Sequence, residues 1–361
     1  MIHIFNPEHD IALGAHLKQF TAPHAARQLR HDLGFLPMIW AEDGDKVLVE
    51  DVAAAEEAFR HLGLEAKGSF LSWENLTDAL DMRCPEEIAP WGWDLALYHR
   101  MVMAGVSPAI LPLLSRLERI RQLSHRRWAA EHLLPFMRRI PDTVGEAKAV
   151  SRVSDVLALL KEHPLMVVKA PWSCSGRGIR YIDSRNQALF GVQIRNWMRN
   201  IISRQGCLMV EPYYNKVADF AMEFFSDGRG EVRYQGLSVF DTRSGAYTGS
   251  ILDTEQGKED RLASWVNHYQ LNMINEQLAC ILCKELGNQY RGPLGVDMMV
   301  VRVGDKLKVH PCVELNLRGT MGHVALALTR RLKVTPQLMS VVYTDKYRIR
   351  VSPVPSAQDD R

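Results

Sequence analysis

Two neighbouring stretches decide how this sequence folds: GPLGVDMMVVRV at 292–303 and KLKVHPCVELNLRG at 306–319. Both are rich in strand-forming residues, and the turn pair Gly304-Asp305 separates them, so they predict an antiparallel hairpin of 296–303 with 306–316. Side chains alternate between the two faces of a strand. Glu314 and Asn316 therefore share one face, and an apolar face lies opposite.

The hairpin register decides whether a metal site can form. With a two-residue loop, Asp297 faces Cys312 and lies diagonally beside Glu314, about 7–8 Å away. Two carboxylates and the amide of Asn316 are oxygen ligands suited to Mg²⁺ that is shared with substrate phosphates. A three-residue loop would turn Asp297 to the far face. A surface hairpin with scattered polar residues is the alternative interpretation.

Composition narrows the class of protein. The chain has 361 residues, enough for two or three domains. Lys and Arg number 44 against 42 Asp and Glu, a net charge of +2 that favours neither nucleic acid nor an anionic membrane as the main partner. There is no run of about 18 apolar residues and no signal-peptide pattern. The six cysteines are scattered, and we expect a cytoplasmic protein with reduced thiols.

Residues 1–105 alternate between strand and helix patterns, which predicts a parallel sheet covered by helices. The expected strands include 3–5, 36–40 and 64–70. Neither GxGxxG nor GxxxxGK[ST] occurs. The segment NPEHD at 6–10 follows the first strand, where open α/β sheets bind ligands. It is a candidate on the substrate side, and an ordinary polar turn is the alternative.

The next 100 residues contain two basic features. We expect an amphipathic helix at 107–121 and a second helix in SHRRWAAEHLL at 124–134, whose first turn carries Arg126 and Arg127. Positive charge there opposes the helix dipole, so either an anionic ligand or a solvated surface pair would explain it. The strand LMVVKA ends near Lys169, and PWSCSGRGIRYI at 171–182 follows. Its small residues would let backbone amides approach phosphate oxygens; a Gly-rich turn is the alternative.

Two further strands follow a helix expected at 186–202: CLMVEPYY at 207–214 and ADFAMEFF at 218–225. The connector Glu211-Pro212-Tyr213 could read an adenine edge through free backbone groups, and Asp219 could bind a ribose hydroxyl. Residues 241–260 are polar and predict a mobile substrate loop or disorder. A single long helix is expected at 262–286, with Trp265 and Tyr269 on its core face, and another helix at 319–332.

In this order the motifs VVKAPWSCSGRGI, VEPYYNKVADF, GVDMMV and VELNLRG resemble the ATP-grasp superfamily of carboxylate-activating ligases. The resemblance implies mixed α/β and α+β architecture. An N-terminal Rossmann-like pre-ATP-grasp domain would span 1–105, and a two-lobed ATP-grasp domain 106–334. Its small lobe would lie at about 140–210, its large lobe at about 211–334, and 335–361 would be a C-terminal extension.

The resemblance also implies roles for individual residues. Lys169 and Arg318 would be catalytic, and Asp297, Glu314 and Asn316 would bind the metal. The implied nucleotide contacts are Arg126, Lys169, Ser173, Ser175, Gly176, Arg177, Gly178, Glu211, Tyr213 and Asp219. Arg126 stands where many members carry a lysine, and serines and a cysteine stand where glycines are common in the phosphate loop.

The activity implied by the resemblance is an ATP- and Mg²⁺-dependent ligation. The γ-phosphoryl of ATP would activate a substrate carboxylate as an acyl phosphate, which an amine then attacks, because phosphorylation gives the carboxylate a leaving group. The partners would be small-molecule or peptide carboxylates and amines, with no nucleic acid and no membrane, and a homodimer is compatible with this scheme. A phosphotransferase acting on a hydroxyl group and a non-catalytic nucleotide-binding protein are the alternatives.

Overall fold

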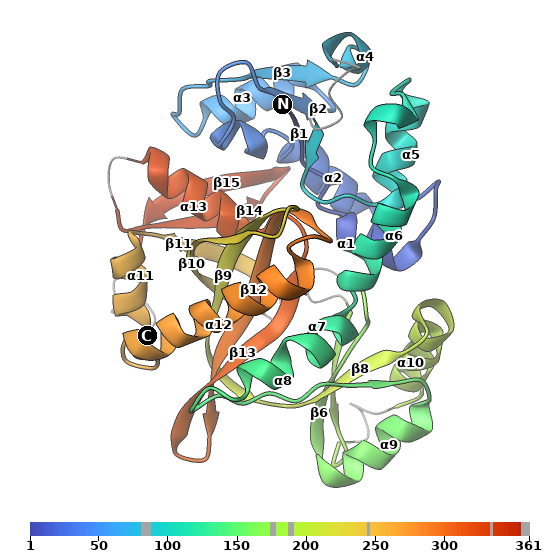
Figure 1. Cartoon of the computed structure of the whole chain (residues 1–361), viewed down its shortest axis with the longest axis vertical. Coiled ribbons are helices and arrows are strands. Elements are labelled where there is room, and N and C mark those ends of the chain that lie inside the picture. Colours follow the sequence, from blue (N-terminus) through green and yellow to red (C-terminus); the bar gives the residue numbers. More distant parts are fainter. Residues whose placement is uncertain (81–87, 174–177, 187–190, 244–245, 333–334, 355–361) are drawn as a thin grey trace.

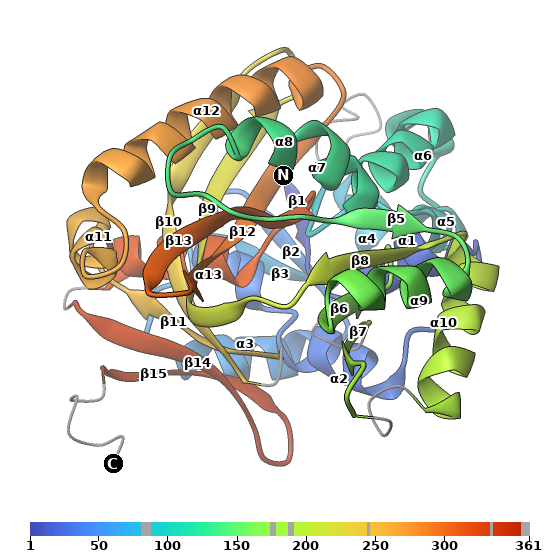
Figure 2. The same ribbon diagram turned by 90° about the horizontal axis from the view of Figure 1, so that it is seen from below.

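The computed structural model describes residues 1–80, 88–173, 178–186, 191–243, 246–332 and 335–354. These residues form three sheets. In Figure 1 the N-terminal sheet lies at the top, the large sheet in the centre and the small sheet at the lower right. Figure 2 shows the same parts from below, with the small sheet beside the large one. Among the described residues, no helix is both long enough and apolar enough to cross a membrane.

The N-terminal sheet is fully parallel, as the alternating pattern predicts. Its strands are β1 (Ile2–Ile4), β2 (Lys46–Val49), β3 (Ser69–Ser72) and β4 (Ile88–Pro90), in the order β3-β2-β1-β4. Its helices are α1 (His9–Ala15), α2 (His24–Asp32), α3 (Val52–Arg60), α4 (Leu76–Ala79) and α5 (Leu95–Met103). Because β1 and β4 are parallel neighbours, the segments that follow them, 5–10 and 91–94, meet at one edge of the sheet.

One predicted strand of this domain is wrong. Leu36–Ile39 forms a 3₁₀ helix, η1, and all four of its residues are buried. An apolar run of this length fits a buried helical turn as well as a strand, and Pro37 in its first turn favours the helix because proline lacks the N–H group that a strand would pair. The strand at this point of the chain is β2, and β3 begins five residues after the expected start at 64.

The small sheet is antiparallel and has helices against it. Its strands are β5 (Lys148–Val150), β6 (Leu165–Lys169), β7 (Ile179–Asp183) and β8 (Leu208–Pro212), in the order β5-β8-β6-β7. Helices α9 (Val153–Glu162) and α10 (Val192–Gln205) bury Val156, Leu160 and Met198 against it in one apolar cluster.

The large sheet has seven strands. They are β9 (Asn215–Asp227), β10 (Val232–Arg243), β11 (Ala246–Leu252), β12 (Arg291–Val303), β13 (Lys306–Asn316), β14 (Gln337–Tyr343) and β15 (Tyr347–Pro353), in the order β13-β12-β9-β10-β11-β14-β15. Residues 337–353, expected as part of an extension, thus supply the last two strands of this sheet. Helices α11 (Glu255–Leu262), α12 (His268–Leu286) and α13 (Met321–Arg331) accompany it.

The N-terminal domain is packed firmly on the large sheet. Phe5, Leu36 and Trp91 share one apolar cluster with Val324 of α13 and Met339 of β14. The backbone N–H of Gly319 also donates to the carbonyl of Trp91 at 2.7 Å. A Cβ at position 319 would lie 2.6 Å from the Trp91 ring, so glycine permits this close approach. The segment after β13 is therefore held against the segment after β4.

The segment between the N-terminal and small sheets forms more and shorter helices than predicted. The expected helix at 107–121 divides into a 3₁₀ turn, η3 (Pro108–Ile110), and α6 (Leu114–Leu123). Pro112 explains the break, because the residue before a proline avoids helical angles. Helix α7 (Arg126–His132) begins two residues after Ser124, with His125 at its N-cap, and α8 (Leu134–Met137) follows.

Two predictions for the segment between β10 and β12 are wrong. Residues 241–260 are not a loop, because they hold the end of β10, β11 and most of α11 among their described residues. The single helix expected at 262–286 begins only at His268, where Asn267 caps α12, and Leu262 is the last residue of α11. Trp265 and Tyr269, expected in the core, are 38% and 72% exposed because the break between the helices turns them outward.

Candidate active site

The hairpin of β12 and β13 brings the two predicted acidic ligands directly opposite each other. Val303 pairs with Lys306, as a two-residue loop predicts, but Asp297 pairs with Glu314 and not with Cys312. A bulge between Asp297 and Met299 shifts the register by two residues, which keeps both carboxylates on the same face. The sequence could not show this bulge, because the alternation of apolar residues survives a shift of two.

On the acidic face, too little positive charge lies near Asp297 to balance its carboxylate. Burial, Glu314 and Glu223 together raise the pKa of Asp297 to about 8. Asn316 donates from Nδ2 to Asp297 Oδ2 at 3.1 Å, which fixes the amide beside the carboxylate. Glu223 on β9 is 1% exposed, and burial raises its pKa to about 8. It was not predicted as part of the site, since its carboxylate reaches this face only through the pairing of β9 with β12.

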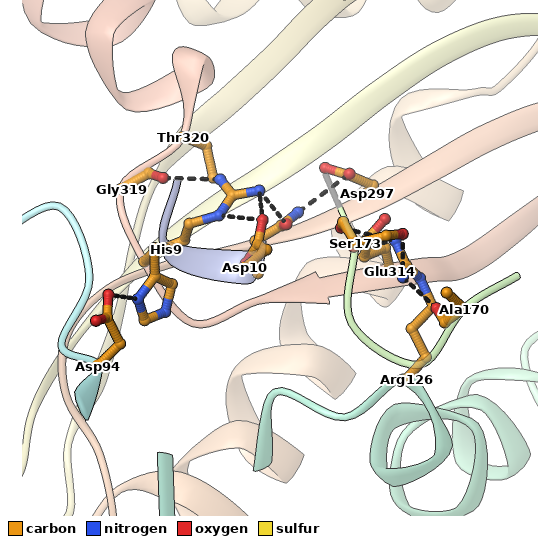
Figure 3. Close-up of polar contacts among 12 residues, drawn as sticks. His9, Asp10, Asp94, Arg126, Ala170, Ser173, Asp297, Glu314, Gly319 and Thr320 are labelled. Atoms are coloured by element: carbon orange, nitrogen blue, oxygen red, sulfur yellow. Dashed lines mark hydrogen bonds and ion pairs between the residues drawn. The ribbon is translucent and has the colours of Figure 1, made fainter. Parts of the chain in front are cut away.

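Arg126 links the acidic face to the small sheet. From the start of α7 it donates Nη2 to Glu314 Oε1 at 2.6 Å. Its Nη1 donates to the carbonyl of Ala170 at 2.6 Å and to Ser173 Oγ at 3.0 Å (Figure 3). Burial would lower its pKa, but Glu314 raises it, so the guanidinium is charged. Of the two basic residues in the first turn of α7, Arg126 is thus a buried connector, whereas Arg127 is an exposed partner of Glu131.

Lys169 ends β6 and faces Glu211 of β8. Val167 pairs with Glu211 and Lys169 with Met209, so Lys169 and Glu211 lie diagonally on one face. Their Nζ and Oε2 atoms are 2.6 Å apart, and both side chains are buried. This buried ion pair holds Lys169 in place beside the connector Glu211-Pro212-Tyr213.

Arg318 joins the acidic face to the N-terminal domain. Its Nε and Nη2 contact Asp10 Oδ2 at 2.9 and 2.7 Å, and Nη2 also donates to Asn316 Oδ1 at 2.9 Å. Burial would raise the pKa of Asp10, but Arg318 lowers it below the ordinary value. The polar chain Asp10, Arg318, Asn316 and Asp297 is therefore continuous. Asp10 comes from NPEHD, which the sequence offered only as a candidate on the substrate side.

The remaining predicted nucleotide contacts fall at the rim of this region or outside it. Gly178 is buried and accepts from the N–H of Ala170 through its carbonyl, next to Ser173. Ser175, Gly176 and Arg177 lie outside the described residues. The Tyr213 N–H donates to the carbonyl of Leu165, and its ring is 43% exposed and lies against Tyr181, away from the charged cluster.

Asp219 lies on β9, close to the hairpin. Its carboxylate accepts from Thr242 Oγ1 at 2.7 Å and pairs with Lys216. In β9 it is opposite Met299 of β12, two positions from Asp297. The partners of Asp219 thus lie on its own strand and on the neighbouring one, and a ribose hydroxyl would have to bind Asp219 together with them.

The donor set at the hairpin fits a hard divalent cation. In the part of the chain that the structure describes, no group of three or more His, Cys, Asp or Glu side chains is arranged to hold a metal. The predicted set is smaller, with two carboxylates and one amide. Burial first, and then the nearby carboxylate of Glu314, raise the pKa of Asp297, and a cation beside the two carboxylates would favour their charged forms.

No protein-family model matches the chain, and no curated protein sequence does. Solved structures do. The biotin carboxylase domain of the Hydrogenobacter thermophilus 2-oxoglutarate carboxylase, with MgADP, ADP and bicarbonate, gives a TM-score of 0.53 at 14% identity over 82% of this chain and 69% of that one. Campylobacter jejuni biotin carboxylase, in a β-γ-ATP complex, gives 0.51 at 13% identity over 94% and 75%. The N5-carboxyaminoimidazole ribonucleotide synthetase of Thermus thermophilus gives 0.49 at 15% identity over 95% and 83%.

The first two likenesses define the class of fold. A parallel N-terminal sheet, a small antiparallel sheet and a large antiparallel sheet follow one another along the chain. The chain has the ATP-grasp fold, as the order of its motifs predicts.

Proposed function

We propose that the chain is an ATP-dependent carboxylate–amine ligase. It transfers the γ-phosphoryl group of ATP to a substrate carboxylate, and an amine then displaces phosphate from the acyl phosphate, which releases ADP and phosphate. The observation that carries the proposal is that three basic side chains lie around the hairpin. Arg126 pairs with Glu314 and Arg318 contacts Asn316, while Lys169, paired with Glu211, is near enough to His310 of β13 to help burial lower its pKa. These side chains come from three separate parts of the sequence.

Phosphoryl transfer asks a protein mainly for alignment and charge neutralisation, which fits this set of side chains. In this structure Arg126 is paired with the carboxylate of Glu314, and Lys169 with that of Glu211. Nucleotide phosphate oxygens are acceptors of the same kind, so they can take the place of these carboxylates as ATP enters. Arg126 also binds Ser173 and Ala170, so a move of its guanidinium toward phosphate would change these two contacts as well.

We assign Asp297, Glu314 and Asn316 as the residues that would hold Mg²⁺. When bound, the ion would neutralise charge on the phosphate oxygens. The neighbouring solved structures contain MgADP, ADP or an ATP analogue, which supports the same use of nucleotide here. The substrates of the proposed reaction are a small-molecule or peptide carboxylate and an amine, and the N-terminal domain at 1–105 would help to select them.

Hydroxylamine trapping tests the proposal directly. Purified protein is incubated with Mg²⁺-ATP, a panel of carboxylic acids that includes the twenty amino acids, and hydroxylamine. A ligase forms a hydroxamate together with ADP. ADP with a phosphorylated alcohol and no hydroxamate would identify a phosphotransferase, and nucleotide binding without ADP release would identify a binding protein; either result contradicts the proposal.

A matched pair of variants locates the reaction. Glu314→Gln keeps an acceptor for Arg126 but removes a carboxylate from the proposed metal site, and we expect ADP release to fall by roughly 10²–10³-fold. Glu131→Gln is the control, because Glu131 is an exposed partner of Arg127 on α7, away from the hairpin face. Equal activity of the two variants would remove the basis for the metal assignment.

A further inference from the structure

The segments that follow β1 and β4 build a histidine–aspartate pair that the reaction so far does not use. His9 Nδ1 and Asp94 Oδ2 are 3.1 Å apart, and the two residues are 1% and 2% exposed. Asp94 Oδ2 also accepts from Asn6 Nδ2 at 3.2 Å, and its Oδ1 caps α5 by accepting from the N–H of Leu97 at 2.8 Å. The carboxylate is held from three sides, so the imidazole cannot turn freely.

Glycine at position 92 makes this arrangement possible. A Cβ there would lie 2.6 Å from the His9 ring, closer than real side chains approach. Asn6 fixes the same glycine from both sides, because Asn6 Nδ2 donates to its carbonyl at 2.8 Å and its N–H donates to Asn6 Oδ1 at 3.3 Å. The imidazole therefore lies flat against backbone and has a single orientation.

Asp94 also fixes the tautomer. An ionised carboxylate can only accept, so His9 Nδ1 carries the proton and Nε2 presents a lone pair. In this structure Nε2 is buried and has no hydrogen-bond partner. A buried polar atom without a partner is costly, and a bound hydrogen-bond donor would satisfy it. The neighbouring Glu8 also has a buried carboxylate oxygen, Oε2, without a partner.

Both atoms without a partner are hydrogen-bond acceptors, and this defines the class of ligand. Glu8 pairs with Arg30 and Asp10 with Arg318, so the two acceptor atoms without a partner, rather than net charge, select the ligand: they favour a group that donates N–H bonds. An amine fits this requirement, and a second carboxylate does not.

The pair lies next to the proposed reaction centre. Asp10 follows His9 in the chain and binds Arg318, which reaches Asn316 and, through it, Asp297. Figure 3 shows Asp94, His9 and Asp10 in a row that leads toward Asp297 and Glu314. Arg318 and Arg126 both lower the pKa of Asp10, so these groups share one electrostatic neighbourhood.

We propose that the segments after β1 and β4 form the site of the amine substrate, where His9 Nε2 accepts the proton of the attacking nitrogen and Asp94 positions the imidazole. This inference rests on the proposed ligase reaction. The nitrogen lone pair forms the C–N bond at the acyl carbon, and the C–O bond breaks so that phosphate leaves with that electron pair. The proton lost by nitrogen moves to Nε2, while Nδ1–H stays bound to Asp94.

Two nitrogen probes separate this step from carboxylate activation. Hydroxylamine is unprotonated at neutral pH and a strong nucleophile, so it attacks an acyl phosphate without a base; ammonium must lose a proton first. We expect His9→Asn, whose amide can still donate to Asp94, to lower amide formation from ammonium by roughly 10²–10⁴-fold while hydroxamate formation stays at the wild-type rate. His16→Asn, at the exposed end of the same helix, should leave both rates unchanged.

The outcomes distinguish the two proposals. If wild type forms hydroxamate and His9→Asn forms amide from ammonium as fast as wild type, the role of His9 is wrong and the ligase stands. If wild type forms no hydroxamate with any acid, the ligase proposal fails and takes this one with it. Loss of both rates together in a folded His9→Asn would make His9 part of activation and also contradict the amine site.

A spectroscopic measurement on the intact wild-type protein covers the case in which the variant does not fold. Nitrogen NMR of the histidine rings should show His9 as the Nδ1–H tautomer at pH 7.5, with its signal assigned by the change that Asp94→Asn causes. Asn retains the cap of α5 but can donate to Nδ1, which should invert the tautomer and lower the ammonium-dependent rate. An Nε2–H tautomer in wild type would overturn the proposal.

Discussion

Two ion pairs in this molecule, one buried and one half-buried, have nearly the same length and different origins. Lys169 and Glu211 are 2.6 Å apart on neighbouring strands of the small sheet. Arg318 and Asp10 are 2.7 Å apart, and 308 residues separate them in the chain. The first pair lies within one sheet, whereas the second joins the N-terminal domain to the end of β13. The comparison indicates that charge is used locally to hold Lys169 at the end of its strand and over long range to fix one domain against another.

The largest effect is expected from breaking the long-range pair. Asp10→Asn leaves the charged Arg318 in a largely buried place without a counter-ion, so we expect the free energy of unfolding to fall by about 3–5 kcal/mol. Arg318 would also lose its orientation toward Asn316, and ADP release should fall with it. Urea unfolding and a coupled ADP assay measure the two effects.

A double variant separates stability from function at this pair. Asp10→Asn combined with Arg318→Gln removes both charges and should recover most of the unfolding free energy, because no uncompensated charge remains. ADP release should not recover, since the basic group is gone. If the single Asp10→Asn variant were as stable as wild type, the pair would not be what joins the two domains.

A smaller effect is expected from the local pair. Lys169→Met with Glu211→Leu replaces both charges by apolar side chains of similar size, and such replacements of buried pairs are often neutral or stabilising. ATP affinity should still fall by roughly 10–100-fold, or about 1.4–2.8 kcal/mol, because the phosphates lose a cation. Calorimetric titration with ATP measures this loss. Unchanged affinity would contradict the role proposed for Lys169.

The difference between the pairs also explains what the sequence could predict. Strand alternation placed Asp297 and Glu314 on one face, and the apolar run before Lys169 placed that lysine at a strand end. These inferences need only local pattern. The exact partner of Asp297 depended on a bulge, which local pattern does not reveal. The partners of Arg318 and the contact of His9 with Asp94 depend on which distant loops meet, and this is set by the packing of whole domains.

The sequence did support one inference about parts of the chain that are far apart, and it concerned the parallel N-terminal sheet. Placing NPEHD at the carboxyl end of β1 put it on the ligand side of the sheet, but its partner segment at 91–94 follows β4, which was not predicted. The missed strand β2 and the apolar turn Leu36–Ile39 show the same limit, because a short buried run fits either structure.

The smallest predicted effect is on the pH dependence of stability, and it comes from His310, near the Lys169–Glu211 pair. His310 of β13 lies beside the ring of Tyr214, and burial together with Lys169 lowers its pKa to about 3. An unfolded histidine binds its proton near pH 6.5, so the unfolded state takes up more protons than the folded state as pH falls below this value. The stability from His310 is thus present above pH 6.5, and about 1 kcal/mol of it is lost between pH 6.5 and 5.5.

His310→Leu should remove this part of the acid sensitivity. Its unfolding free energy should depend on pH less steeply than that of wild type between 6.5 and 5.5, and the exposed His24→Leu variant should keep the wild-type slope. Urea unfolding at a series of pH values gives the slopes. Equal slopes for wild type and His310→Leu would mean that His310 takes up a proton as readily in the folded state as in the unfolded state. Lys169 would then not be holding it neutral, and the charge at this end of the site would be less concentrated than the geometry indicates.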